Sequence, residues 1–230
     1  MGESLLQCAI RGGSVPIVHM LMERGFSVSS KGAYGYTPLH QVAYTSNLSL
    51  CEFLLDQGGN LDALSTNGST PLLVACREGQ IALVECMLRY GADPVDGGDK
   101  GVTPLMIAAA EGHDRIIQLL VEYGANINEP TTFELRTPLH EAVEGGHLQT
   151  CMTILQFGGT PSITALDADG ASPIDVASAL CRPDIADHLR THASISPLHF
   201  SPKRPDKKPS TSPPILSTLP LPSLLSAEAS

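Results

Sequence analysis

The stretch that decides the fold is Thr103-Pro104-Leu105-Met106-Ile107-Ala108-Ala109-Ala110-Glu111-Gly112-His113. Its first four residues have counterparts elsewhere in the chain, which are Thr37-Pro38-Leu39-His40, Thr70-Pro71-Leu72-Leu73, Thr137-Pro138-Leu139-His140 and the weaker Ser172-Pro173-Ile174-Asp175. Successive copies are 33 to 35 residues apart, and a copy without the proline begins at Ser4. A fixed period of this length is the signature of a repeat architecture.

The residue types at each position of the unit favour two short helices. Thr103 suits a helix N-cap, because its hydroxyl can accept a hydrogen bond from the first turn, and Pro104 suits the first helical position. Gly112 ends this helix, and the apolar residues of 116–121 follow at helical spacing. Gly124 then suits a left-handed helix C-terminus. The sequence therefore predicts six units, each with two helices and a connecting loop.

This pattern resembles the ankyrin-repeat family over about residues 1–193. The resemblance implies an all-α solenoid of stacked helix-turn-helix units with protruding hairpin loops, called fingers below. We expect repeats at about 1–33, 34–66, 67–99, 100–133, 134–168 and 169–193. Some positions depart from the pattern: Ser46 and Cys181 replace the mid-repeat glycine, and Leu135 replaces a finger glycine. Repeat six also lacks the final glycine and suits a C-terminal cap, whereas the completeness of the N-terminus is left open.

Residues 194–230 differ in composition, with eight Pro and nine Ser, and predict a disordered Pro/Ser-rich tail. The segment 203–208 holds four basic residues, Lys203, Arg204, Lys207 and Lys208, which form either a nuclear-import cluster or a solubilising segment. Residues 219–225 resemble the cullin-contacting end of a SOCS box, although Pro/Leu-rich disorder explains them equally well.

Charge and composition exclude several classes of protein. The net charge is −10; residues 194–230 carry four basic and two acidic residues, so the remainder carries −12. This acidity argues against a nucleic-acid surface and favours a basic partner, a solvated acidic surface being the alternative. We find no signal peptide and no apolar run long enough to span a membrane, and we expect a monomer in the cytoplasm, the nucleus or both.

Motifs for catalysis or cofactor binding are absent from the sequence, so we expect no enzyme activity, no cofactor and no metal. His40, His113, His140 and His147 lie on the repeat register and are interpreted as structural, and His188 and His192 lack further metal ligands at matched spacing. The six cysteines stand singly, on or beside helix positions, and are expected to be buried, inert thiols.

The family resemblance implies a concave binding face, made of the finger tips and of helix-one positions seven and eight residues after the Thr. Transferred by register, the predicted partner-binding residues are Tyr34, Tyr36, Tyr44, Thr45, Arg77, Glu78, Lys100, Glu111, Phe133, Arg136 and Glu144. Three of the five tyrosines fall in one repeat, which suits an interface anchor, unless Tyr34 and Tyr36 only shield a neighbouring loop.

We therefore expect a non-catalytic interaction module: a scaffold, adaptor or inhibitor that binds a protein partner on the concave face. The alternatives are a substrate receptor of a cullin-type ubiquitin ligase and a nuclear regulator that masks a transcription factor.

Overall fold

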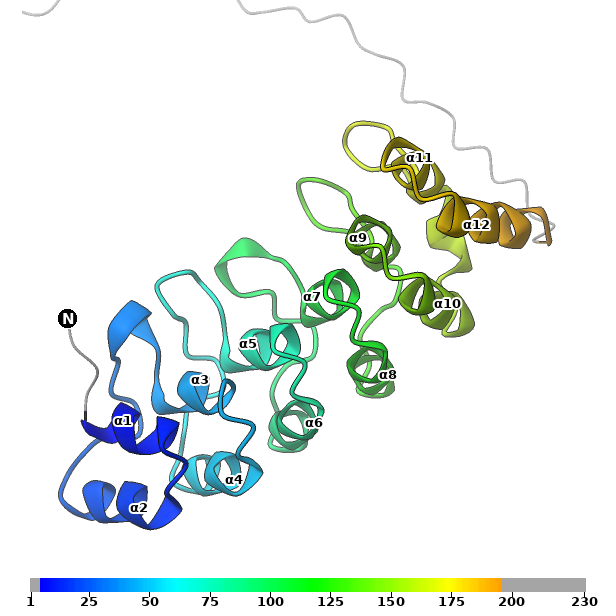
Figure 1. Ribbon diagram of the computed structural model, residues 1–230. Helices are drawn as coiled ribbons and strands as arrows, with labels where there is room; N and C mark the ends of the chain where they lie inside the picture. The colour runs from blue at the N-terminus through cyan, green and yellow to red at the C-terminus, as the bar shows by residue number, and fades with distance from the viewer. Residues whose placement is uncertain (1–4, 196–230) are drawn as a thin grey trace, which may run out of the picture. The chain divides into compact units, whose positions relative to one another are not determined.

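The fold is a stack of helix pairs, seen in a computed structural model that describes residues 5–195 (Figure 1). These residues form twelve α-helices and no strand. The helices are α1 (Leu5–Arg11), α2 (Val15–Glu23), α3 (Pro38–Val42), α4 (Leu48–Asp56), α5 (Pro71–Arg77), α6 (Ile81–Arg89), α7 (Pro104–Ala110), α8 (Asp114–Glu122), α9 (Pro138–Gly145), α10 (Leu148–Gln156), α11 (Pro173–Ala179) and α12 (Pro183–Ile195). Short 3₁₀-helices lie at Ala33–Gly35, Gly98–Lys100 and Thr160–Thr164.

The pairs stack so that their first and second helices form two separate rows. Figure 1 shows the odd-numbered helices from α1 to α11 in one row and the even-numbered helices in the other, with loops projecting beside the odd-numbered row. Each helix packs against its own partner and against its counterparts in adjacent pairs. The expected all-α ankyrin-type solenoid is thereby confirmed.

The Thr-Pro pairs start the first helices as predicted. Thr70 and Thr103 have extended backbones, and their Oγ1 atoms accept from backbone N–H groups three residues on, at 3.4 and 3.3 Å. Pro71 and Pro104 occupy the first helical position, where the missing N–H has no intrahelical partner to lose.

The core runs along the whole stack between the two rows. The small residues Ala75, Ala108 and Ala142 are fully buried, which lets neighbouring helices approach closely. On the second helices, the buried side chains follow helical spacing, as Ile116 and Leu120 do on α8. Each helix pair buries its apolar surface against adjacent pairs, so the core is continuous although no single pair is large.

Histidine or glutamine side chains tie successive repeats together. The backbone N–H of Thr37 donates to His40 Nδ1 (3.2 Å), so the proton of the neutral ring lies on Nε2, which donates to the carbonyl of Ser69 (2.9 Å). His140 repeats this arrangement towards Ala171, and Gln7 donates in the same way to Tyr36. The predicted structural role of His40 and His140 is therefore confirmed.

A left-handed backbone and the close approach of a histidine ring both favour glycine at the mid-repeat positions. Gly79 and Gly112 have φ of +69° and +78°, and a Cβ there would lie 2.7 Å from the ring of His113 or His147. Those rings donate to the carbonyls of Arg77 (3.2 Å) and Ala110 (3.0 Å), which confirms their structural role.

The three replacements of expected glycines keep the glycine conformation. Ser46, Leu135 and Cys181 have φ of +54°, +54° and +55°. The surrounding fold therefore imposes a left-handed backbone on residues that disfavour it.

Two helix boundaries differ from the regular unit. The helix α3 ends at Val42 because the carbonyl of Val42 accepts both the backbone N–H (2.8 Å) and the hydroxyl (3.0 Å) of Thr45, which replaces the helical pattern. The helix α12 continues to Ile195, past residue 193, where the sequence predicted the repeats to end. Within residues 5–195, none of the helices combines the length and the apolar character that a membrane crossing requires.

Candidate functional site

Backbone hydrogen bonds link three pairs of neighbouring fingers. The N–H of Thr66 donates to the carbonyl of Tyr34 (2.9 Å), and the N–H of Ala168 donates to the carbonyl of Glu134 (2.8 Å). A similar bond joins Asp99 to Gly68 (3.0 Å). The fingers and the odd-numbered helices lie on one side of the stack (Figure 1), which we call the binding face.

Three tyrosines of repeat two gather at the N-terminal part of the binding face. The ring of Tyr36 lies 6.3 Å from that of Tyr34 and 5.9 Å from that of Tyr44, measured between centroids. The hydroxyls of Tyr36 and Tyr44 are hydrogen-bonded at 3.1 Å. Tyr34 is 71% exposed and Tyr44 is 42% exposed. We call these residues the tyrosine cluster.

Several contacts hold the tyrosine cluster in place. Tyr36 stacks on His40 with centroids 5.3 Å apart and an interplanar angle of 3°. Tyr34 has a left-handed backbone, with φ of +57°, and its carbonyl accepts both the N–H and the hydroxyl of Thr66, each at 2.9 Å. Burial and the hydrogen bond with Tyr36 raise the pKa of Tyr44 above its ordinary value.

The middle of the binding face is charged and open. Arg77, Glu78 and Glu111, three of the predicted residues, are exposed. Thr45 is half-buried, and its hydroxyl is committed to the carbonyl of Val42. The backbone of Lys100 lies in the 3₁₀-helix of the repeat-four finger, while its side chain is outside the described part of the chain.

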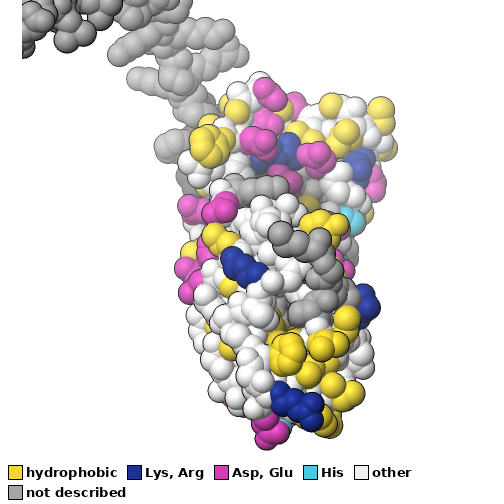
Figure 2. All heavy atoms as spheres, turned by 90° about the vertical axis from the view of Figure 1, so that its left-hand side faces the viewer, with side chains coloured by type: hydrophobic (Ala, Val, Ile, Leu, Met, Phe, Trp, Pro, Cys, Tyr) yellow, Lys and Arg dark blue, Asp and Glu magenta, His cyan; other side chains and the backbone are white. Residues whose placement is uncertain are grey.

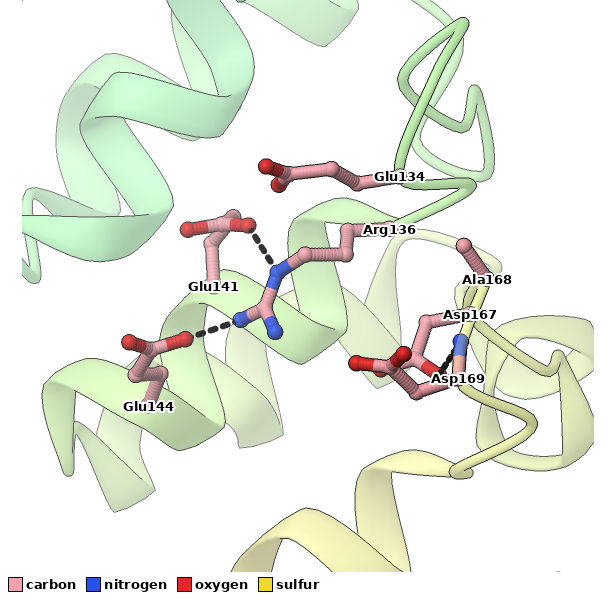
Figure 3. Close-up of a pocket in the computed structure, with 7 residues that line it drawn as sticks. All are labelled: Glu134, Arg136, Glu141, Glu144, Asp167, Ala168 and Asp169. Atoms are coloured by element: carbon pink, nitrogen blue, oxygen red, sulfur yellow. Dashed lines mark hydrogen bonds and ion pairs between the residues drawn. The ribbon is translucent and has the colours of Figure 1, made fainter.

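A hollow of about 460 Å³ lies at the C-terminal part of the binding face, between the fingers of repeats five and six and α9 (Figure 3). Arg136 points into its centre, where Nε donates to Glu141 (2.7 Å) and the guanidinium also pairs with Glu144. The other carboxylates that line the hollow belong to Glu134, Asp167 and Asp169. We use the name acidic hollow for the cavity lined by Arg136 and these five carboxylates.

The carboxylates of the hollow shift the pKa of Arg136, whose guanidinium is largely shielded from solvent. Burial alone would lower the pKa of Arg136, but the hydrogen bond that Arg136 donates to Glu141 and the negative charges of Glu141, Glu144 and Asp167 raise the pKa overall. With five carboxylates and one guanidinium, the hollow is strongly negative. Figure 2 shows acidic side chains gathered in the upper part of the view, which corresponds to α9–α12 in Figure 1.

The predicted residues thus lie in three parts of one face, which are the tyrosine cluster, the charged middle and the acidic hollow. Tyr34, Tyr36 and Tyr44 are brought together, as are Arg136 and Glu144, while Phe133 stands 87% exposed on the repeat-five finger. The guanidinium of Arg136 is used internally, so it helps to shape the face and is not a free donor.

The repeat register also places Glu134 at a finger tip, but three acidic residues of the hollow were not predicted: Glu141, Asp167 and Asp169. Asp169 occupies the same finger position as Glu134, three residues before the helix cap, so extending the register to repeat six would have found it. Glu141 lies on α9, four residues after Thr137, at a position that the family resemblance does not assign to partner binding.

The cysteine prediction holds for four of the six thiols. Cys51, Cys76, Cys86 and Cys151 are buried, and burial raises the pKa of each, to about 12 for Cys151. The prediction is wrong for Cys8 and Cys181, which are exposed. Cys181 is exposed because it stands at the mid-repeat turn of the last repeat, where no following repeat covers it within residues 5–195.

Metal-type clusters of three or more His, Cys, Asp or Glu side chains do not occur within residues 5–195. The rings of His188 and His192 lie 4.7 Å apart on α12. The predicted tail, its basic cluster (Lys203, Arg204, Lys207 and Lys208) and the segment 219–225 lie outside the described residues.

Comparison with known proteins establishes the class. The family pattern described as ankyrin repeats in three copies matches residues 1–64 and 41–131, and the single ankyrin-repeat pattern matches residues 134–168. This chain belongs to the ankyrin-repeat family.

Among solved structures, the chain is similar to the ankyrin repeat domain of Bcl-3, whose crystal structure is described as that of a unique member of the IkappaB protein family. The identity is 27% and the TM-score is 0.73, with 83% of this chain and 86% of the other covered. A comparison with curated proteins finds no match.

Proposed function

We propose that this chain is a non-catalytic protein-interaction module that holds a protein partner on the binding face. The observation that carries the proposal is the exposure of large side chains, Tyr34 and Phe133 among them, on fingers that are each hydrogen-bonded to a neighbouring finger. Their rings are exposed although the neighbouring backbone is fixed. A surface ordered before binding loses little conformational entropy when a partner docks.

The module would act as a scaffold, adaptor or inhibitor that recognises its partner by shape and charge and catalyses no reaction. Family membership supports this role, because ankyrin repeats are an interaction fold. We propose that the module works as a monomer in the cytoplasm, the nucleus or both, and that it does not bind nucleic acid, since an anionic face repels phosphate. Light scattering coupled to size-exclusion chromatography tests whether the protein is a monomer. An electrophoretic mobility-shift assay with duplex DNA tests whether it binds nucleic acid.

A second candidate is a nuclear regulator that masks a basic segment of a transcription factor. The specific observation in its favour is the similarity to the Bcl-3 domain, a member of the IkappaB family by its description. Changing Lys203, Arg204, Lys207 and Lys208 to Ala and imaging the protein in cells tests this candidate. Unchanged nuclear accumulation would count against an import role for the cluster.

The first proposal is tested by affinity capture from cell lysate with the full chain. The variant Tyr34→Ala/Tyr44→Ala/Phe133→Ala removes three exposed rings from the binding face, and Tyr123→Ala removes an exposed ring from the C-cap of α8 as a matched control. A protein that is retained by the wild type and by Tyr123→Ala, but lost by the triple variant, should then bind in purified form. Capture that the triple variant leaves intact would contradict the proposal, once circular dichroism shows that the variants fold.

A further inference from the structure

We propose that the N-terminal end of the stack is a docking surface for an apolar helix pair of the ankyrin-repeat kind, contributed by a different protein. The surface consists of Leu5 on α1 and of Ile17 and Met20 on α2, and we call these residues the end face. Ile17 and Met20 lie on an even-numbered helix, outside the binding face, so the inference goes beyond the proposed function. It is carried by the repeat register, by the contacts between repeats and by the contrast between the two ends of the stack.

The end face exposes apolar side chains at positions that later repeats cover. Ile17 is 50% exposed, whereas its counterparts are at most 1% exposed: Leu50, Leu83, Ile116, Thr150 and Ile185. Leu5 is 66% exposed, and the proline at the same position of every later repeat is buried. Met20 is 48% exposed, and its counterparts are buried or half-buried: Phe53, Cys86, Leu119, Thr153 and His188. Figure 2, which looks onto this end of the stack, shows hydrophobic side chains gathered low in the view.

These positions face the preceding repeat wherever one is present. Thr150 on α10 donates from Oγ1 to the carboxylate of Asp114 in the repeat before it (2.6 Å). The ring of Phe53 on α4 lies 5.5 Å from that of His19, again in the repeat before it. Both register positions therefore lie on the side of a repeat that meets its predecessor. Within residues 5–195 no helix pair precedes α1, so the end face is a stacking surface that no described repeat covers.

The opposite end of the stack is closed by polar side chains. In the last repeat Ser178 and Arg190 are exposed, and they replace apolar residues that repeat five buries as Val143 and Leu155. Arg190 donates from Nη2 to Ser178 Oγ (3.1 Å), and Ser178 Oγ donates to the carbonyl of Ile174 (2.8 Å). A polar outer face keeps the terminal unit of a repeat stack soluble. The end face instead keeps apolar residue types, as an internal repeat does, and an exposed apolar patch marks an interaction site.

The direction of stacking identifies the occupant. Each repeat meets its predecessor through one side and its successor through the other, and the first helices pack in this order from α1 to α11. The complement of the end face is therefore the successor side of a helix pair, apolar as at Val143 and Leu155. A second copy of this chain does not offer that side, because its own last repeat presents Ser178 and Arg190. The occupant is thus a helix pair of a different protein that continues the same stack.

The first test asks whether the end face accepts such a helix pair. The probe is the full chain carrying Ser178→Val/Arg190→Leu, which restores the residue types of an internal repeat, together with Ile17→Lys/Met20→Glu, which prevents the probe from stacking on itself. It is mixed with the wild type, with Ile17→Lys/Met20→Glu alone and with Ile81→Lys/Val95→Glu. The last variant is the matched control, since Ile81 and Val95 are exposed elsewhere (43% and 48%). Circular dichroism first establishes that each variant folds.

We expect sedimentation velocity to show a one-to-one complex of the probe with the wild type and with Ile81→Lys/Val95→Glu. Ile17→Lys/Met20→Glu should weaken this complex at least about tenfold, because two apolar side chains lose their burial. A folded probe that does not bind the wild type would overturn the inference, and so would equal binding by Ile17→Lys/Met20→Glu. Self-association of the wild type through Ile17 and Met20 would also overturn it, since a second copy would then cover the end face.

The second test identifies the occupant in cells. The full chain carries a photoreactive benzoylphenylalanine in place of Ile17, or in place of Ile81 as the control, and mass spectrometry identifies the cross-linked peptide. We expect a cross-link from position 17 to a helix of a different protein, one with apolar residues at helical spacing. Cross-links confined to this chain's own residues, or no cross-link above the control, would overturn the inference. Capture through Tyr34 and Phe133 is a separate measurement, so failure here leaves the proposed function standing.

Discussion

His40 donates from Nε2 to the carbonyl of Ser69, 2.9 Å away, and so joins repeat two to repeat three. His140 makes the equivalent bond to Ala171. Burial lowers the pKa of both histidines below the ordinary 6.5, against the opposing effect of these same hydrogen bonds. A lowered folded-state pKa means that the unfolded chain binds protons more readily.

The first prediction is a loss of stability in acid. The contribution of the neutral rings is fully present above about pH 6.5 and falls as the pH drops below that value, because protons favour the unfolded chain. Urea denaturation at about pH 7.5 and about pH 5.5 should show this, with a smaller difference in His40→Leu/His140→Leu. Leucine is chosen because Leu73 occupies the same position in repeat three. An equal acid response in the double variant would refute the assignment.

The second prediction concerns Gly112, which combines a left-handed backbone with the ring of His147 against it. Gly112→Ala should destabilise the fold by more than Gly124→Ala, since a Cβ at Gly124 meets nothing within 4 Å although its φ is also positive, at +99°. Backbone strain of about 1 kcal/mol is common to both, so the difference in the free energy of unfolding reports the clash. Equal urea midpoints would show that the ring of His147 moves aside freely.

The third prediction is that glycine stabilises the fold at Leu135 and Cys181. Both residues have a left-handed backbone, so Leu135→Gly and Cys181→Gly should each raise the free energy of unfolding by about 0.5–1 kcal/mol. Ser46→Gly should gain less, because Ser46 Oγ donates to Gln80 Oε1 at 2.6 Å and this bond would be lost. Thermal and urea unfolding of the three variants measure the order, and a larger gain at Ser46 would contradict it.

The fourth prediction concerns thiol reactivity. Cys8 and Cys181 are exposed, whereas the other four cysteines are buried and have raised pKa values. An aromatic disulfide reagent that releases a coloured thiolate should therefore modify Cys8 and Cys181 quickly in the native protein. The remaining thiols should react only in denaturant. Rapid modification of Cys76 in the native state would show that the stack opens readily.

The fifth prediction concerns Arg136, which balances part of the acidic hollow. Arg136→Met keeps much of the side-chain volume but leaves Glu141 and Glu144 without their cation, and it should cost about 1–3 kcal/mol. Because the cost includes repulsion among carboxylates, added salt should recover part of it. Glu144→Gln removes only the more exposed partner and should cost less. Denaturation at low and high ionic strength measures both effects.

Much of the fold follows from local chemistry that is visible in the sequence. Thr70-Pro71 and Thr103-Pro104 start helices as their capping chemistry requires, and Gly79 and Gly112 turn the chain as glycine permits. These features repeat on one register, so each copy supports the others. Leu135 was harder to interpret, since its residue type disfavours the conformation that the neighbouring repeats impose on it.

The candidate site was predicted less completely, because its properties depend on contacts between repeats. The register placed Arg136 on the binding face, but only the structure shows its guanidinium held by Glu141 and Glu144. It likewise grouped Tyr34, Tyr36 and Tyr44 without indicating that Tyr36 stacks on His40. Side-chain pairing of this kind depends on rotamers and distances that residue spacing does not determine.

The hydrogen bonds between finger tips have a mechanical consequence. A partner that pulls on the finger of repeat two also loads Thr66 of the next finger through the carbonyl of Tyr34. Part of the force is therefore carried by the neighbouring finger. The force needed to displace one finger should therefore depend on its hydrogen bonds to the fingers beside it.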